Sequence, residues 1–242
     1  MVTLNKETIL GVNVSVTSYE ELKKCVEEDI KNNKKSFIVA INPEKILKAR
    51  EEEKLKDLLN SADYQIPDGI GVVYASKLKK GKIKSRITGI DCMEMLCNEA
   101  NDKGYKIFLY GAKKDIIKEA KKRLEEKFEN IKIVGAIDGY EKNNDKIIKE
   151  INKSKADIIF VALGSPKQEN WILENKDKVC IKIFQGVGGS FDVISGNIKR
   201  APIWMQKIGL EWLYRLIKEP KRIFRQIKLV KFLVLVLFKR NS

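Results

Sequence analysis

The chain has 242 residues, of which 43% are hydrophobic, so it can bury a sizeable core and does not resemble a disordered protein. Its 48 Lys and Arg exceed its 33 Asp and Glu, and a net charge of +15 predicts an anionic partner. That partner could be nucleic acid, an acidic membrane surface or a phosphorylated substrate. Histidine is absent, which excludes Ser-His-Asp and Cys-His sites and any His-ligated metal. Acid–base chemistry must therefore come from carboxylates, Lys, Tyr or Cys.

The four cysteines form no Cys-x-x-Cys pair, and their spacing suits neither a zinc site nor a disulfide framework. Cysteines without a disulfide pattern are typical of proteins in a reducing cytoplasm. The N-terminus has no cationic segment followed by an apolar stretch, so we expect no secretory signal. We also expect no membrane-spanning helix, because no apolar run reaches the ~20 residues that one needs.

In chain order, short apolar runs predict strands, and amphipathic stretches between them predict helices. The expected strands are 37–41, 63–66 (short and weaker), 106–110, 131–137, 157–163 and 181–187. The expected helices are 44–59, 92–103, 114–128, 146–153 and 167–175. This alternation predicts an α/β fold with a mostly parallel sheet and flanking helices. Ligands of such sheets bind beyond the carboxyl ends of the strands, so the loops after the strands are the candidate site.

The composition changes near residue 198. Residues 199–242 contain 12 Lys or Arg and two Asp or Glu, so they carry +10 of the net charge. Their apolar residues include Trp204, Trp212, Tyr214, Phe224 and the run 232–238. Cations combined with aromatic and aliphatic side chains are typical of an interfacial membrane segment. We therefore expect an α/β core over 1–198 and a basic, amphipathic, membrane-associating helical appendage over 199–242.

Two polar side chains follow the first two expected strands. Asn42 precedes Pro43, a pattern typical of a helix N-cap, and the same position would line a ligand crevice. Asp68, followed by Gly69, either caps the next helix or presents its carboxylate to the crevice. In a chain without histidine, Asp68 is a leading candidate for a general base.

Arg86 and Gly111 are two further candidates. Arg86 is either a solvated cation or a diphosphate clamp, since a guanidinium binds phosphate oxygens in pairs. Gly111 directly follows the strand 106–110, where a missing side chain permits close approach of a ligand to the backbone.

The motif that begins at Gly164 is the densest. Ser165 and Gln168 fit a capping box, with Pro166 as the first helical residue. A helix N-terminus after a strand is also an anion site, and Lys167 adds positive charge there.

The stretch 186–192 follows the last expected strand and is rich in glycine without matching G-x-G-x-x-G, so a dinucleotide fingerprint is not supported. Gly186, Gly188 and Asp192 could instead form a crevice wall for a nucleotide. No Asp-x-Asp occurs in the chain, so we expect no metal held by that motif. Arg, Lys and backbone N–H groups would then stabilise a leaving diphosphate.

Together these motifs resemble the WecG/TagA/CpsF family of bacterial glycosyltransferases. The matching stretches are 42–44, 67–73, 86–89, 164–169, 186–192, 199–202, 209–215 and 219–220. The resemblance implies a Rossmann-like, inverting, metal-independent and cofactor-free transferase on the inner face of the cell membrane. Its donor would be a UDP-activated amino sugar of the UDP-N-acetylmannosamine type. Its acceptor would be undecaprenyl-diphosphate-linked N-acetylglucosamine, in the synthesis of a surface polymer such as the linkage unit of teichoic acid.

The resemblance also implies roles for single residues. Asp68 would be the general base, and Asn42, Arg86 and Gln168 would contribute to the substrate site. One position departs from the family, because Ala40 stands where its members often have Thr.

The basic appendage would help to complete the site at the membrane. Three of its cations are the candidates for binding the acceptor diphosphate and the membrane: Arg215, Arg222 and Arg225.

Other functions stay open at this point. A family member could use another donor, such as UDP-ManNAcA, for a different surface glycan. A catalytically silent membrane-peripheral protein is a second alternative. A nucleic-acid-binding protein is disfavoured, because the charge lies in a tail with an apolar end and no recognised nucleic-acid motif is present. The sequence leaves the oligomeric state open, a homo-oligomer included.

Overall fold

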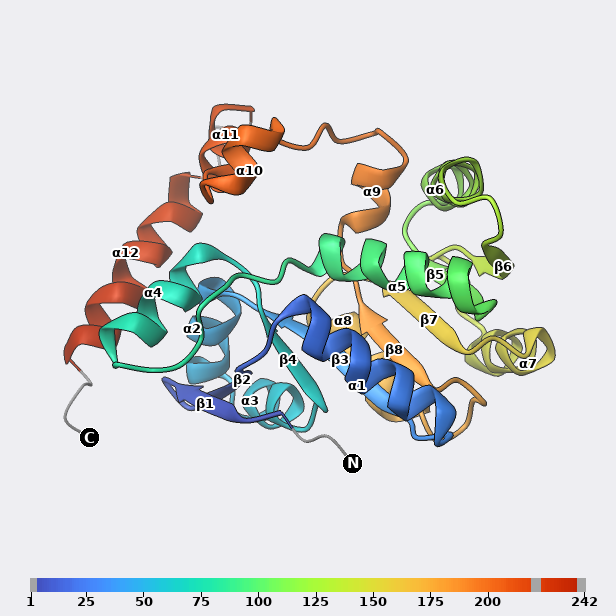
Figure 1. Ribbon diagram of the computed structural model, residues 1–242, viewed down its shortest axis with the longest axis horizontal. Helices are drawn as coiled ribbons and strands as arrows, with labels where there is room; N and C mark the ends of the chain where they lie inside the picture. The colour runs from blue at the N-terminus through green and yellow to red at the C-terminus, as the bar shows by residue number, and fades with distance from the viewer. Residues whose placement is uncertain (1–3, 219–222, 239–242) are drawn as a thin grey trace.

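A computed structural model describes residues 4–218 and 223–238, except for the side chains of residues 207, 215 and 223–227 (Figure 1). Its centre is a six-stranded, wholly parallel sheet in the order β4-β3-β8-β7-β5-β6. The strands are β3 (Ser36–Ile41), β4 (Tyr64–Pro67), β5 (Lys106–Gly111), β6 (Lys132–Ile137), β7 (Ile158–Ala162) and β8 (Ile183–Gly186). The predicted α/β fold with a parallel sheet is therefore confirmed.

Helices cover both faces of this sheet, because successive side chains of a strand point to opposite faces. Phe37 and Val39 of β3 pack into one apolar cluster, while Ile38 packs into the other. The first face carries α2 (Pro43–Glu51), α3 (Glu53–Asn60), α4 (Ile70–Leu78), α7 (Asn144–Ser154) and α8 (Lys167–Asn175). The second face carries α1 (Tyr19–Lys31), α5 (Gly89–Lys103), α6 (Lys114–Lys127) and α9 (Ser190–Ile194).

Sequence patterns missed part of the first eighty residues. The expected helix 44–59 is wrong in its continuity, because Glu52 has φ −127° and ψ 96°, a strand-like conformation that separates α2 from α3. An antiparallel hairpin of β1 (Lys6–Ile9) and β2 (Val12–Ser15) was not expected, and neither was α1. Helix α4 was expected only as the helix after Asp68, without bounds. A signal for α1 was present, since Ser18 and Glu21 form a capping box at its start.

In the described part of residues 199–242, the predicted appendage, the chain forms α10 (Ile203–Lys207), α11 (Glu211–Lys218) and α12 (Ile223–Phe238). The chain passes from α9 to α10 and α11, which lie on the same side of the molecule as α4 and α12 (Figure 1). Proline disfavours a helix interior, so the sequence predicts a break or bend at Pro220, but this residue lies outside the described residues. No helix in the described ranges is long and apolar enough to cross a membrane.

Helix α12 packs against α2 and α4. Phe232 and Val236, one turn apart, are 0% and 1% exposed within the first apolar cluster. The contact is close: a Cβ atom on Gly71 of α4 would lie 2.7 Å from Leu229 Cδ1. The interpretation of 232–238 as a run that faces the membrane is therefore wrong for Phe232 and Val236, because their side chains fill the protein core. The division into a core over 1–198 and an appendage stays a prediction.

Candidate active site

Asn42 and Asp68 lie side by side at the carboxyl ends of β3 and β4. The strands are in register with Ile41 opposite Pro67, and the Asp68 N–H donates to the Ile41 carbonyl at 2.8 Å. Asn42 is the N-cap of α2, as predicted, and its Oδ1 accepts from the Lys45 N–H at 2.9 Å. Asp68 does not cap α4, whose N-cap is Gly69, so that interpretation is wrong. Its half-buried carboxylate belongs to the loop between strand and helix.

Arg86 lies next to the Asp68 loop, because the Ile87 N–H donates to the Pro67 carbonyl at 2.9 Å. Its side chain is 16% exposed, so it is not a solvated cation. Arg86 Nη2 lies 2.8 Å from Glu211 Oε2 and donates to the Gln206 carbonyl at 3.3 Å. The guanidinium therefore joins the core to the appendage.

The capping box predicted for Ser165 and Gln168 is wrong. Pro166 is the N-cap of α8, and no side chain caps this helix. Gln168 is buried and bonds elsewhere: its Oε1 accepts from the Gly188 N–H at 3.0 Å, and its Nε2 donates to Glu169 Oε1 at 3.1 Å. The amide thus turns inward to the loop after β8.

A buried ion pair connects the helices that carry Asn42 and Gln168. Lys45 Nζ of α2 lies 2.8 Å from Glu169 Oε1 of α8, and both side chains are largely shielded from solvent. Such pairs depend on good geometry, since each charge is costly to bury alone. The structure therefore brings Asn42, Asp68, Arg86 and Gln168 to one part of the carboxyl edge.

The candidate glycines differ in what fills the space beside them. A Cβ on Gly111 would lie 2.4 Å from the Ala162 carbonyl oxygen, so the backbone of β7 occupies that space. A Cβ on Gly186 would lie 2.6 Å from Gln168 Nε2, so this glycine makes room for the amide. Gly164 and Gly188 have positive φ angles and open space on that side, which leaves their backbone accessible.

A cavity of about 370 Å³ lies at the carboxyl ends of β5, β6 and β7. It contains the predicted residues Lys167 and Asp192, the latter held by a bond from Asn197 Nδ2 at 3.1 Å. Sequence reasoning missed Lys113 and Tyr140, which also line it. The signal was available, because Tyr140 follows the expected strand 131–137 just as the other candidates follow theirs. Ser165 is exposed in the neighbouring loop.

The three appendage arginines are placed only in part. Arg215 lies on α11 and Arg225 on α12, and their side chains are not described. Arg222 lies outside the described residues. Their roles stay predictions.

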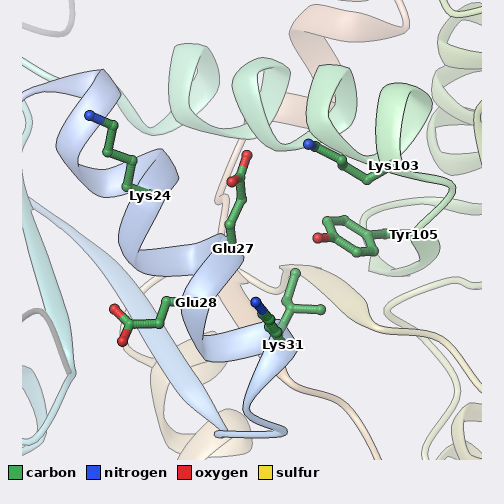
Figure 2. A pocket seen from close by; sticks show the side chains of 7 residues that line it. Lys24, Glu27, Glu28, Lys31, Lys103 and Tyr105 are labelled. Carbon is green, nitrogen blue, oxygen red and sulfur yellow. The ribbon is translucent and has the colours of Figure 1, made fainter.

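A second cavity, of about 540 Å³, lies between α1 and the end of α5. Figure 2 shows the side chains around it: Lys24, Glu27, Glu28, Lys31, Lys103 and Tyr105. Tyr105 directly precedes β5, so this cavity lies at the amino ends of the strands, away from the loops described above. It takes no part in the candidate site.

The thiol groups of Cys92 and Cys97 are unsuited to the chemistry of this site. Cys92 and Cys97 are fully buried, and burial raises the pKa of both thiols well above the usual range, which keeps them protonated. Among the residues that the structure describes, no cluster of three Cys, Asp or Glu could hold a metal ion.

Fold and site together define a Rossmann-like α/β protein that gathers a carboxylate, two amides and several cations where such sheets bind ligands. The chain belongs to the glycosyl transferase WecG/TagA/CpsF family, whose model matches residues 7–242. The resemblance drawn from the motifs is thereby confirmed.

Two curated relatives carry the same name, N-acetylglucosaminyldiphosphoundecaprenol N-acetyl-beta-D-mannosaminyltransferase. The protein from Bacillus subtilis (strain 168) is 40% identical over 233 residues, which cover 96% of this chain and 90% of the relative. The protein from Bacillus spizizenii (strain ATCC 23059 / NRRL B-14472 / W23) is 42% identical over 205 residues, which cover 85% and 80%.

Proposed function

We propose that this chain transfers N-acetylmannosamine from UDP-N-acetylmannosamine to undecaprenyl-diphosphate-linked N-acetylglucosamine. The observation that carries the proposal is the convergence of Asp68, Asn42, Arg86 and Gln168 at the carboxyl edge of the sheet, the same edge that carries a cavity of about 370 Å³ at the ends of β5, β6 and β7. The names of the two relatives support the choice of sugar and acceptor. The product would enter a surface polymer such as the linkage unit of teichoic acid.

The reaction is a direct displacement that inverts the anomeric carbon. Asp68 takes the proton of the acceptor hydroxyl while the new C–O bond forms. The bond from the anomeric carbon to the diphosphate breaks, and UDP leaves with the electron pair. Positive charge fixed at the site stabilises this leaving group, and Arg86 and Lys167 supply it without a metal ion. Asn42 and Gln168 position the sugar.

The donor nucleotide occupies the cavity at the ends of β5, β6 and β7. Its volume falls in the ordinary range of small-molecule pockets, about 300–1,000 Å³. Tyr140 is 68% exposed at its rim, so its ring is available to stack on the uracil base. Lys113 and Lys167 provide the charge that a diphosphate requires.

The acceptor is held at the membrane surface, and the protein binds peripherally to the inner face. Ile203 and Trp204 of α10 and the following Ile208 are all strongly exposed, in a segment whose other residues carry most of the net charge. Apolar side chains surrounded by cations suit the interface of an anionic bilayer. Arg215, Arg222 and Arg225 bind the acceptor diphosphate there.

The test is transfer by the purified chain with UDP-N-acetylmannosamine and a lipid-diphosphate-linked N-acetylglucosamine. We expect acceptor-dependent release of UDP and a disaccharide product detected by mass spectrometry. UDP-ManNAcA serves as the competing donor. UDP release that does not depend on the acceptor, or a product formed only from UDP-ManNAcA, would contradict the proposal.

A further inference from the structure

Glu211 begins α11 and is only 8% exposed, between two guanidinium groups. Its Oε2 lies 2.8 Å from Arg86 Nη2, and its Oε1 accepts from Arg200 Nε at 3.2 Å. A buried carboxylate needs such partners, because an unpaired charge is costly to remove from water. Arg86 belongs to the core loop beside Asp68, whereas Glu211 belongs to the appendage. The contact therefore couples two parts of the chain that are 125 positions apart.

Arg200 is itself fixed from the side of the core. Its Nη1 lies 2.6 Å from Asp91 Oδ1. Thr88 Oγ1 donates to the other carboxylate oxygen of Asp91 at 2.6 Å. Burial alone would raise the pKa of Asp91, but the bonds from Arg200 and Thr88 outweigh it and hold this pKa below its ordinary value. Asp91 thus holds the Arg200 guanidinium in place, and Arg200 in turn holds the Glu211 carboxylate.

The appendage provides both acceptors that hold Arg86 Nη2. One is Glu211, and the other is the Gln206 carbonyl at the end of α10, 3.3 Å away. Gln206 is tied in turn to the Ala201 carbonyl by a bond of 2.6 Å. A Cβ on Gly209 would lie 3.4 Å from Ile70, so the turn between α10 and α11 rests on the start of α4. In this structure, the direction of the Arg86 guanidinium is therefore set by contacts with the appendage.

We propose that Glu211 is a positioning residue, which holds Arg86 toward the donor diphosphate when the appendage is docked. The inference rests on the proposed function, in which Arg86 binds that diphosphate. A guanidinium presents five N–H donors in a planar fork. The bonds to Glu211 and Gln206 use Nη2, and in this proposal the other N–H groups of the fork bind the diphosphate. The docked appendage thus contributes to the site indirectly, because it holds Arg86 of the core in place.

A competing interpretation makes the opposite prediction. If the Glu211 carboxylate only competed with the diphosphate for the Arg86 guanidinium, removing its charge would free the guanidinium and tighten donor binding. If Glu211 positions Arg86, removing its charge weakens turnover of the donor. Hydrogen bonds to charged groups are strong enough for a loss of about 10- to 100-fold in kcat/KM.

The experiment measures kcat and KM for UDP-N-acetylmannosamine in Glu211→Gln, Glu211→Asp, Arg86→Ala and the double variant Arg86→Ala/Glu211→Gln. We expect Glu211→Gln to lose about 10- to 100-fold in kcat/KM and Glu211→Asp to recover part of it, because the charge returns. In the Arg86→Ala background, Glu211→Gln should change the rate by less than twofold. Lys231→Ala is the matched control, since it removes an exposed pair with Glu51, at 3.9 Å, that also joins the appendage to the core.

Limited proteolysis of the appendage in each variant separates positioning from simple anchoring. Three results would overturn the inference: unchanged kcat/KM in Glu211→Gln, a lower KM in that variant, or equal losses with and without Arg86. A loss of turnover that only follows release of the appendage to protease would also overturn it. If Arg86→Ala transfers sugar at the wild-type rate, the role of Arg86 in the proposed function fails. If Arg86→Ala is severely impaired and Glu211→Gln is not, the positioning inference alone fails.

Discussion

Replacing Phe232 with alanine should reduce the free energy of unfolding by at least about 3 kcal/mol. Phe232 lies in the last described helix, yet its side chain is 0% exposed and belongs to the same apolar cluster as β3 and β7. Losing a buried aromatic ring forfeits roughly 1.5–3 kcal/mol of transfer free energy. The cavity left between α12, α2 and α4 adds to this, and comparable Phe→Ala changes cost about 3–5 kcal/mol.

Urea unfolding followed by far-UV circular dichroism and tryptophan fluorescence would measure this loss. For a chain of this size, 3 kcal/mol corresponds to a fall in Tm of roughly 6–12 °C. Val230→Ala is the matched control on the outer face of the same helix, where the side chain is 63% exposed, and it should stay within about 0.5 kcal/mol of wild type. If Phe232→Ala matches this control, α12 is not part of the cooperative core and the reasoning fails.

Three further outcomes test the site and one tests the fold at acid pH. Asp68→Asn should keep its Tm and its affinity for UDP while losing about 10²- to 10⁴-fold in transfer rate, the usual worth of a general base; a rate within a few-fold of wild type would mean that another group takes the proton. Gly186→Ala should lower kcat while its Tm stays close to that of wild type, because its Cβ would displace the amide of Gln168; a kcat equal to that of wild type would show that the position of Gln168 does not matter for transfer. Transfer should continue in EDTA, and loss of turnover restored by Mg²⁺ would refute the metal-free mechanism. Because the pKa of Asp91 is lowered in the folded chain, its stabilising bonds are complete above the ordinary value of 3.8 and are lost as pH falls through the lowered value; Asp91→Asn should therefore show a weaker decline of Tm in this acid range than wild type.

Local patterns predicted those features that local interactions decide. The cap at Asn42 needs only the three residues that follow it, and the buried strands needed only their own apolar runs. The candidate loops followed from the strands, because parallel strands expose their carboxyl ends at one edge.

Features set by distant partners could not be predicted in this way. Gln168 satisfies the capping pattern, yet its amide binds Gly188 in another loop. The sequence left Arg86 open between a solvated cation and a diphosphate clamp, because its partner Glu211 lies 125 positions later in the chain. The apolar run 232–238 reads as a membrane segment because its sequence does not reveal that α2 and α4 cover Phe232 and Val236.

The strand order also governs when the site can form during folding. β8 is the last strand in the described part of the chain, yet it lies between β3 and β7 in the middle of the sheet. Until residues 183–186 have been synthesised, the strand that joins β3 to β7 is missing, so β4-β3 and β7-β5-β6 cannot form one sheet. Asn42 and Asp68 belong to the first piece, while Tyr140 and Lys167 follow strands of the second. Because β3 and β8 pair across a long stretch of chain, we expect this pairing to be a slow, non-local step, on which the assembly of both halves of the candidate site depends.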